Sequence, residues 1–378
     1  MKLAVMNRDP RVDQWIHLLP EDSPHSVDVV YGAMSGNEPT QTIHRERTEW
    51  ESLLHATDVD AVVMGHDAPT DLLHEQLTRL AQAGLPMLLS HPIAGILECF
   101  SLQMIQRETG GLIYPLVEAC DEDAVALIRQ WCADPERCPV GVIEQIAIER
   151  PMADRNRKFA EPQFAADAYL MRRMLGSFRQ LNAVGVEPTQ SDWSRLRVQL
   201  VSRTGVPVSW VMTASPTPDT PQLTLMGDQG TLPMRMQSYP DHWTLASGEP
   251  LEFDSPSPPH PFDLAATQLN DGFSVWDDAC RGLELADTIE YSARRGKTVE
   301  MHEPEVTEAG TFRGVMAASG CFILLGTLAA TLLLAAIESI WSIGGAFRYA
   351  PWLLLATAMI VFLGLQLLNL ALPKEKSD

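Results

Sequence analysis

Apolar and polar positions along the first 138 residues follow a pattern that predicts strands and helices in turn. Short apolar runs of strand length lie at 2–6, 27–31, 59–64, 87–89 and 112–116. Between them, apolar residues recur at helical spacing at 12–19, 50–56, 72–83, 98–109 and 122–131. Strands that alternate with helices form parallel sheets covered on both faces. Residues 1–138 are therefore predicted to be a Rossmann-like, doubly wound α/β domain.

The stretch 58–95 carries this pattern most completely, as strand, helix and strand. Such a crossover is almost always right-handed, and ligands bind beyond the carboxyl ends of its strands. The loops 65–69 and 90–92 follow those ends, so they are the first candidates for chemistry.

The alternation of predicted strands and helices ends at Pro139. Strands are predicted at 141–148, 181–186, 196–202, 206–213, 223–226 and 231–236. Turn residues at 203–205 and 227–230 join neighbouring antiparallel strands, one helix is predicted at 164–175, and an amphipathic helix runs over 276–295. Residues 139–301 are thus predicted to form an α+β domain with a mostly antiparallel sheet.

The last part of the chain predicts a membrane anchor. An acidic tether, 302–313, leads to two uncharged apolar stretches, 314–337 and 351–372. Each has about the 20 residues that a transmembrane helix needs. Basic residues flank the outer ends of the pair, which by the positive-inside rule places both termini and the soluble domains in the cytoplasm. The predicted location is the cytoplasmic membrane, with the lipid bilayer as a partner.

Charge and cysteine content narrow the functional classes. The net charge is −21, which argues against binding to nucleic acid because nothing neutralises a phosphate backbone. The six cysteines form no CxxC pair. They are expected to be reduced and packed, and no metal site is predicted.

Three stretches in this order, 58–63, 223–232 and 278–296, are similar to the glucose-fructose oxidoreductase, inositol dehydrogenase and MocA (Gfo/Idh/MocA) family. The resemblance covers residues 1–301. It implies NAD or NADP as cofactor, a sugar or polyol as ligand, and homo-oligomers that form through the sheet of the second domain.

The resemblance also indicates where a cofactor pocket would lie. Its positions in this chain are Asn7, Arg8, Arg11, Gly65, His66, Pro69 and Pro92. The glycine-rich turn of the family is replaced by a segment without glycine, in which Asp9 would repel a phosphate and Pro10 lacks a backbone donor. The segment 32–36 has no carboxylate for the ribose hydroxyls. The dinucleotide site is therefore interpreted as degenerate.

Two residues are the candidates for proton transfer. His91 stands where the family has a lysine, and an imidazole can still move a proton. On the helix of the second domain, Pro162 and Ala166 stand where the family has an acid and a histidine, and Asp167 is adjacent. His91 and Asp167 are thus the predicted catalytic candidates.

Besides a pure interaction module that captures a partner protein, two functions remain open. The first is a catalytically degenerate, membrane-anchored pseudoenzyme that serves as a ligand-binding or scaffold protein. The alternative is an active NAD(P)-dependent oxidoreductase that acts on a sugar or polyol, with His91 in place of the lysine. Whether the protein is an enzyme is left undecided by the sequence.

Overall fold

The structure is a computed structural model of the chain. It divides into two units, Met1–His302 and Glu303–Asp378. The residues that it describes are 1–20, 22–31, 43–47, 49–186, 193, 195–216, 220–251, 253, 257–271, 275–302, 325–327, 329 and 331–333.

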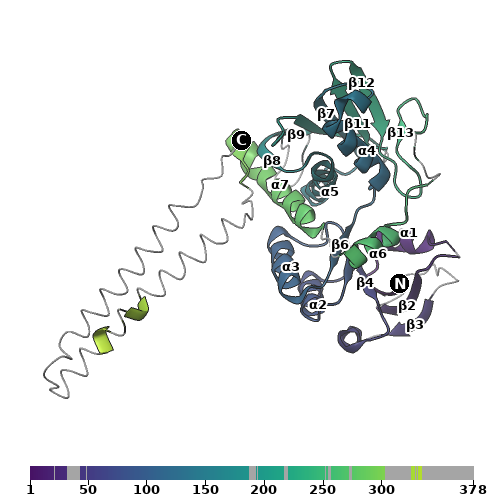
Figure 1. Cartoon of the computed structure of the whole chain (residues 1–378), viewed down its shortest axis with the longest axis vertical. Helices are drawn as coiled ribbons and strands as arrows, with labels where there is room; N and C mark the ends of the chain where they lie inside the picture. Colours follow the sequence, from purple (N-terminus) through teal and green to yellow (C-terminus); the bar gives the residue numbers. More distant parts are fainter. Residues whose placement is uncertain are drawn as a thin grey trace. The chain divides into compact units, whose positions relative to one another are not determined.

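The first sheet of unit 1 is parallel throughout, in the order β3-β2-β1-β4-β5-β6 (Figure 1). Its strands are β1 (Lys2–Met6), β2 (Ser26–Tyr31), β3 (Ile43–Arg47), β4 (Ala61–Met64), β5 (Met87–Ser90) and β6 (Ile113–Leu116). Its helices are α1 (Pro10–His17), η1 (Trp50–His55), α2 (Thr70–Gln82), α3 (Ile96–Thr109), α4 (Glu122–Ala133) and η2 (Pro135–Arg137). The predicted Rossmann-like sheet is confirmed.

The order of these strands reverses between β1 and β4. Chain order runs from β1 to β3 in one direction and from β4 to β6 in the other. The strands β4, β5 and β6 are buried at every position, as their uninterrupted apolar runs predict. The carboxyl ends of β1 and β4 therefore frame the crevice in which folds of this kind bind ligands.

The second sheet has the order β13-β12-β11-β7-β10-β9-β8-β14 and is antiparallel except where β7 pairs with β10. Its strands are β7 (Ile143–Met152), β8 (Phe178–Val186), β9 (Arg195–Ser202), β10 (Pro207–Ala214), β11 (Gln222–Gly227), β12 (Gly230–Arg235), β13 (Thr244–Leu245) and β14 (Val299–Glu300). Helices α5 (Arg157–Leu175) and α7 (Trp276–Arg295) pack on each other, and α7 packs on β8. The predicted, mostly antiparallel second sheet is confirmed.

Helix α6 (Pro261–Asp271) lies in a proline-rich segment for which the sequence predicted only loop. His260, just before it, contacts the Trp15 carbonyl oxygen at 3.1 Å, and Asp263 in its first turn contacts His25 Nε2 at 2.8 Å. The segment after β13 thus returns to the side of the parallel sheet and packs beside α1 (Figure 1).

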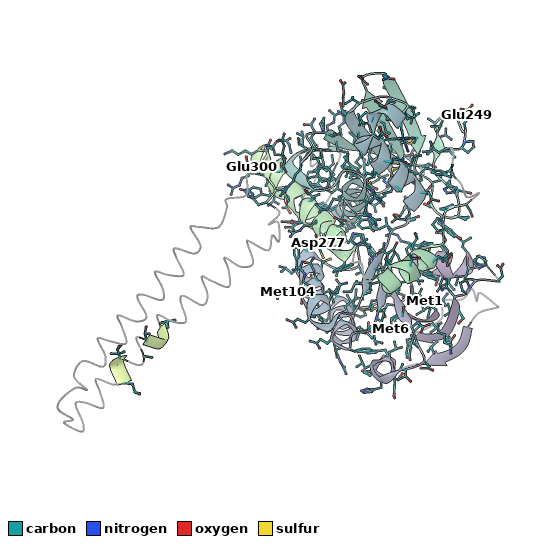
Figure 2. The ribbon with its side chains drawn as sticks, viewed as in Figure 1. Met1, Met6, Met104, Glu249, Asp277 and Glu300 are labelled. Atoms are coloured by element: carbon teal, nitrogen blue, oxygen red, sulfur yellow. The ribbon has the colours of Figure 1, made fainter. Side chains whose placement is uncertain are left out.

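Apolar side chains from both sheets fill the interior (Figure 2). Met6, at the end of β1, is 1% exposed, whereas Met104 on α3 is 63% exposed and projects from the surface. Four tryptophans, Trp193, Trp210, Trp243 and Trp276, are fully buried in this unit.

The predicted membrane location is wrong on the evidence of the described residues, among which no helix is long and apolar enough to cross a bilayer. The predicted spans 314–337 and 351–372 lie outside the described residues, apart from short helical pieces at 325–327, 329 and 331–333. The tether beyond His302 also lies outside them.

Candidate functional site

The turn after β1 takes the place of a glycine-rich loop. Asn7 adopts a φ of 49°, a left-handed conformation that asparagine tolerates better than most residues, and its side-chain nitrogen donates to Gln76 Oε1 at 2.7 Å. Asp9 is the N-cap of α1, where its Oδ1 accepts from the backbone nitrogens of Arg11 (3.0 Å) and Val12 (2.9 Å). The N-terminus of this helix is therefore already occupied by a carboxylate.

The loop after β4 packs closely against this turn. A Cβ atom at Gly65 would lie 2.3 Å from the Asn7 carbonyl oxygen and 2.7 Å from the Asp9 nitrogen, so only glycine fits. The close approach brings His66 to Asp9, whose Oδ2 accepts from the His66 backbone nitrogen at 3.1 Å and from Nδ1 at 2.7 Å.

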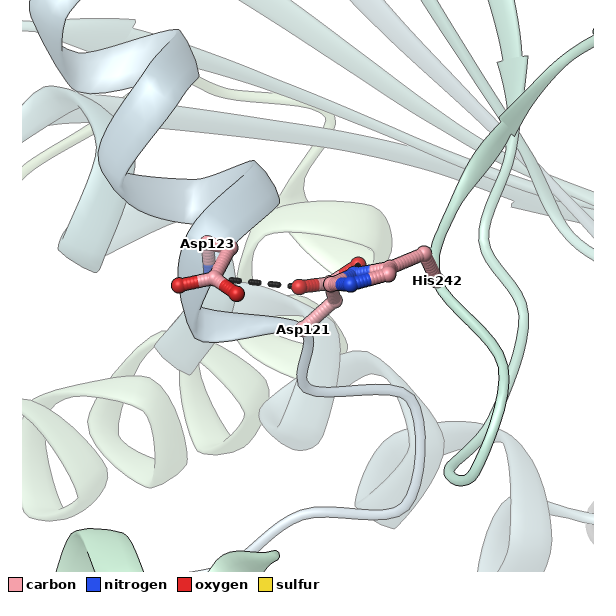
Figure 3. Close-up of side chains that lie close together, drawn as sticks. All are labelled: Asp121, Asp123 and His242. Carbon is pink, nitrogen blue, oxygen red and sulfur yellow. Dashed lines mark hydrogen bonds and ion pairs between the residues drawn. The ribbon is translucent and has the colours of Figure 1, made fainter. Parts of the chain in front are cut away.

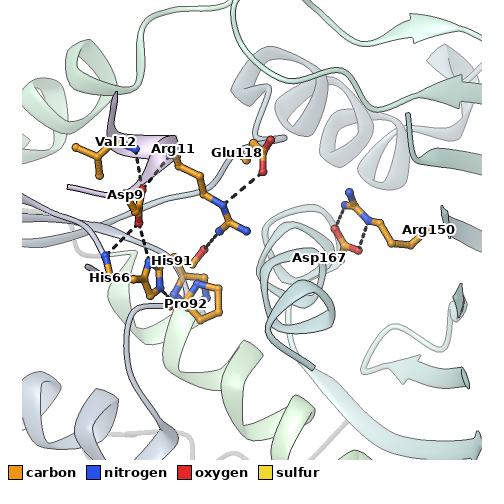
Figure 4. A network of polar contacts seen from close by, with 9 residues as sticks. All are labelled: Asp9, Arg11, Val12, His66, His91, Pro92, Glu118, Arg150 and Asp167. Carbon is orange, nitrogen blue, oxygen red and sulfur yellow. Dashed lines mark hydrogen bonds and ion pairs between the residues drawn. The ribbon is translucent and has the colours of Figure 1, made fainter. Parts of the chain in front are cut away.

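His66 continues the connection to the loop after β5, because its Nε2 contacts the Pro92 carbonyl oxygen (Figure 4). Both ring nitrogens of His66 thus face oxygen atoms. Burial acts to raise the pKa of Asp9, but the hydrogen bonds from His66 and Val12 and the charge of His66 outweigh it and lower that pKa to about 2. The hydrogen bonds between Asp9 and His66 span the crevice between β1 and β4.

A cavity of about 1140 Å³ opens beside Asp9 and His66. From the first domain it is lined by Asp9, Arg11, His66, His91, Pro92 and Glu118, among others. From the second it is lined by Arg150, Lys158, Phe159, Pro162, Asp167 and Tyr239, among others. Its position, at the carboxyl edge of the parallel sheet, is the expected one for a ligand site of this fold.

His91 lines the cavity but is fully buried, with 0% of the residue exposed. Its ring packs against Tyr169 and Trp276, with centroid distances of 6.0 and 6.3 Å, and neither ring nitrogen has a hydrogen-bond partner among the described residues. Burial, followed by the charges of His66 and Arg11, lowers the pKa of His91 to about 3. The imidazole is therefore neutral and enclosed by apolar surface.

Asp167 also lines the cavity, and it is 1% exposed. Arg150 holds both of its carboxylate oxygens, Nε donating to Oδ2 at 3.0 Å and Nη2 donating to Oδ1 (Figure 4). Trp210 Nε1 also donates to Oδ2, at 2.7 Å. Both oxygens of this carboxylate already accept hydrogen bonds from neighbouring side chains, so Asp167 is poorly placed to accept a proton from a ligand.

The predicted pocket residues separate into two groups. Arg11, His66 and Pro92 line the cavity; Arg11 forms an ion pair with Glu118 at 3.5 Å and donates to the His91 carbonyl oxygen at 3.3 Å.

The remaining predicted positions, Asn7, Arg8, Gly65 and Pro69, are not among the residues that line the cavity. Arg8 instead pairs with Asp13 at 2.5 Å, and Pro69 precedes α2 at its N-cap position. The segment 32–36, in which a ribose acid was sought, lies outside the described residues.

The sequence did not single out Glu118 or Tyr239 as site residues. Arg150 belongs to a basic segment, 150–158, that could face an anionic ligand, a partner or lipid head groups, and a second signal marks this arginine. It follows Ile146 and Ile148 at the same period-two positions of β7, so a charge occupies an inward-facing place in an otherwise apolar series.

One further polar cluster lies at the N-terminus of α4 (Figure 3). Asp121 Oδ1 accepts from the backbone nitrogens of Asp123 and Ala124, at 3.1 and 3.2 Å, and Oδ2 contacts the Trp243 nitrogen at 2.9 Å and His242 Nδ1 at 3.0 Å. Asp121, Asp123 and His242 are close enough to hold an ion. Four contacts already use the Asp121 carboxylate. We therefore interpret the cluster as a structural link between the N-terminus of α4 and residues 236–243, here called the cavity strap.

No protein-family model and no curated protein sequence matches the chain. Several solved structures, however, are similar to the chain. A myo-inositol dehydrogenase from Corynebacterium glutamicum is 17% identical with a TM-score of 0.60, covering 80% of this chain and 99% of its own. An aldose-aldose oxidoreductase from Caulobacter crescentus, complexed with glycerol, is 14% identical with a TM-score of 0.62, covering 80% and 99%.

The WlbA dehydrogenase from Chromobacterium violaceum, in complex with NADH and UDP-GlcNAcA, is 15% identical with a TM-score of 0.59, covering 80% of this chain and 96% of its own. At these identities the likeness concerns the fold. The chain therefore shares its fold with these solved dehydrogenases and oxidoreductases.

Proposed function

We propose that the protein binds a small sugar-like ligand in the cavity and does not use a dinucleotide to oxidise or reduce it. The observation that carries this proposal is the Asp9 carboxylate at the N-terminus of α1. In Rossmann folds this helix end holds the pyrophosphate through free backbone nitrogens and a favourable dipole. Here the carboxylate takes those nitrogens, and it is ionised at neutral pH because its pKa is about 2.

The residues present do not fit a dinucleotide at a second point. The contact between His66 and the Pro92 carbonyl oxygen crosses from one loop to the next at the edge of the sheet. A cofactor that ran along this edge would have to break this contact together with the hydrogen bonds between Asp9 and His66.

The candidate catalytic residues support the same reading. His91 has no exposed surface through which to reach a ligand proton, and Asp167 is held by Arg150 and Trp210. What remains is a cavity with apolar and charged walls, and that combination is typical of a site that binds and orients a polar small molecule. A sugar-like ligand is favoured because the structural neighbours include complexes with glycerol and with UDP-GlcNAcA.

The second candidate is an active NAD(P)-dependent oxidoreductase that acts on a sugar or polyol. Its support is that structural neighbours were solved with NAD or NADH and share the two-domain fold. It requires Asp9 and His66 to separate, so that the end of α1 becomes free.

One titration distinguishes the two candidates. The full chain is mixed with NADH or NADPH, and binding is followed by nucleotide fluorescence, while calorimetry follows a panel of sugars and polyols. The proposal expects a saturable sugar signal and no saturable nucleotide signal up to about 1 mM, a concentration that corresponds to about −4 kcal/mol of binding. Nucleotide binding at micromolar concentration together with oxidation of a sugar would establish the second candidate instead.

Homo-oligomerisation through the second sheet remains part of the proposal. The outward positions of β9, Arg195, Arg197 and Gln199, are exposed in the single chain. A molar mass from light scattering equal to that of one chain would contradict it.

A further inference from the structure

Arg150 occupies an unusual place for a charged residue. It follows Ile146 and Ile148 on the inward face of β7, and it is 9% exposed. A guanidinium at such a position costs free energy unless it is paired, and an apolar side chain would serve packing better. Arg150 stands near the end of the strand, where the inward face opens into the cavity.

Asp167 pairs with one edge of the guanidinium. Nε and one N–H of Nη2 donate to the two carboxylate oxygens, and Trp210 holds the same carboxylate from the other side (Figure 4). Trp210 is fully buried and packs edge-on against Phe164 at a centroid distance of 5.2 Å. The orientation of Arg150 is thus fixed by groups that do not themselves need a ligand.

The opposite edge of Arg150 consists of Nη1 and the second N–H of Nη2, and no described residue is bonded to Nη1. An arginine edge with two parallel N–H groups matches a carboxylate in a two-bond, planar arrangement. A preoriented edge of this kind binds its partner with little loss of side-chain freedom.

The other charges in the cavity favour a singly charged ligand. The carboxylates of Asp9 and Glu118 are paired with His66 and Arg11. Asp154 and Asp241 are exposed, lie at the cavity and add negative charge, while Lys158, also exposed, adds positive charge. A dianionic phosphate would meet more repulsion from these carboxylates than a carboxylate would.

Apolar surface lies beside these charges. Phe159, in the first turn of α5, is 57% exposed and lines the cavity together with Pro162 and Tyr239. Aromatic and proline faces at a cavity wall suit the C–H side of a sugar ring, while a charged group of the ligand lies against Arg150.

We propose that the free edge of the Arg150 guanidinium binds a carboxylate of the cavity ligand, which makes the ligand class sugar acids such as hexuronates. This assignment rests on the proposed function, the binding of a sugar-like ligand. Arg150 is then a ligand-binding residue, and Asp167 and Trp210 are its positioning residues.

Calorimetry with the full chain tests the assignment through a matched pair of ligands. D-glucuronate and D-glucose differ only in a carboxylate that replaces a hydroxymethyl group. The expected result is that glucuronate binds at least about tenfold more tightly than glucose, the effect of about one charge-assisted pair. D-glucose 6-phosphate is the third ligand, and it is expected to bind more weakly than glucuronate.

Arg150→Lys is the diagnostic variant, because it keeps the charge and loses the planar edge. It is expected to remove most of the preference for glucuronate over glucose, whereas Arg107→Lys, an exposed arginine on α3, leaves that preference unchanged. Lys158→Gln at the exposed position reduces the preference by about twofold to threefold, as expected for a solvated charge. Circular dichroism checks that each variant is folded, and the Lys158 variant remains informative if Arg150→Lys does not fold.

The outcomes separate the two proposals. Equal binding of glucose and glucuronate overturns the assignment to Arg150 but leaves the sugar-binding function standing. Tighter binding of the 6-phosphate than of glucuronate overturns the carboxylate class. If none of the three ligands nor any sugar of the wider panel binds, both the function and the assignment fail.

Discussion

The Asp9 carboxylate and His66 Nδ1 lie 2.7 Å apart across the point at which the order of the parallel strands reverses. Asp9 follows β1 and His66 follows β4, so the pair joins the two loops between which folds of this kind admit a ligand. The positive end of α1 is thereby satisfied from within the chain.

Removing the Asp9 charge should therefore create affinity for a phosphate. Asp9→Ser keeps a capping hydroxyl and removes a carboxylate whose repulsion of a phosphate about 4 Å away amounts to about 4 kcal/mol at an effective dielectric constant of 20. We expect ADP to bind this variant at least about tenfold more tightly than it binds the unmodified protein, as measured by calorimetry. Asp13→Ser, in the same helix turn, is the control and should leave ADP binding unchanged. Equal affinities in all three proteins would show that Asp9 does not exclude phosphate.

The same carboxylate should stabilise the protein in a pH-dependent way. Its pKa is about 2 in the folded protein and 3.8 ordinarily, so its contribution is complete above about pH 4 and is lost as the pH falls towards 2. Between pH 5 and pH 3 the unmodified protein should lose about 1 kcal/mol more unfolding free energy than Asp9→Asn. Urea titrations at the two pH values measure this difference, and parallel losses in both proteins would contradict the expectation.

His91 should make the stability of the protein depend on pH in a second, higher pH range. Its pKa of about 3 lies below the ordinary value of 6.5, so the unfolded chain binds a proton that the folded protein excludes. Stability is complete above about pH 6.5 and falls as the pH decreases towards 3. Between pH 7 and pH 5 the unfolding free energy should fall by about 2 kcal/mol.

The variant His91→Leu should remove that pH dependence, because leucine fills a similar volume and does not titrate. His74→Gln, at an exposed position of α2, is the control and should leave the slope unchanged. An unchanged slope in His91→Leu would mean that the imidazole is already accessible to protons, and would restore it as a candidate for proton transfer.

Much of the fold could be predicted because its strands carry local signals. The runs at β4 and β5 are apolar at consecutive positions, and Gly84 ends the intervening helix with a φ of 70°. The start of α5 was missed by seven residues, at Phe164 instead of Arg157, because Pro162 suggests a helix boundary. In the structure Asn156 caps the helix by accepting from the Lys158 nitrogen at 3.0 Å, and the proline is tolerated within it.

The candidate site was less predictable because its contacts join distant parts of the chain. Asp9 and His66 are 57 residues apart, and sequence reasoning treated Asp9 only as a group that repels phosphate. Arg150 meets Asp167 only once β7 and α5 have packed in register. The burial of His91 likewise depends on Trp276, from the last helix of the unit. Pairing and burial of this kind decide which polar residues are free to act.

The cavity strap should depend on a single carboxylate. Asp121 is 1% exposed, caps α4 and accepts from the Trp243 backbone nitrogen, so Asp121→Ala loses a cap and leaves a buried donor unpaired. We expect a loss of about 2–4 kcal/mol in unfolding free energy. Asp123→Ala, two residues further along in the first turn of α4, should lower the unfolding free energy by less than about 1 kcal/mol, as expected for a charge near a helix N-terminus. Hydrogen exchange at Trp243 should accelerate only in the first variant; equal exchange in both would mean that the strap is held by its packing against the second sheet instead of by Asp121.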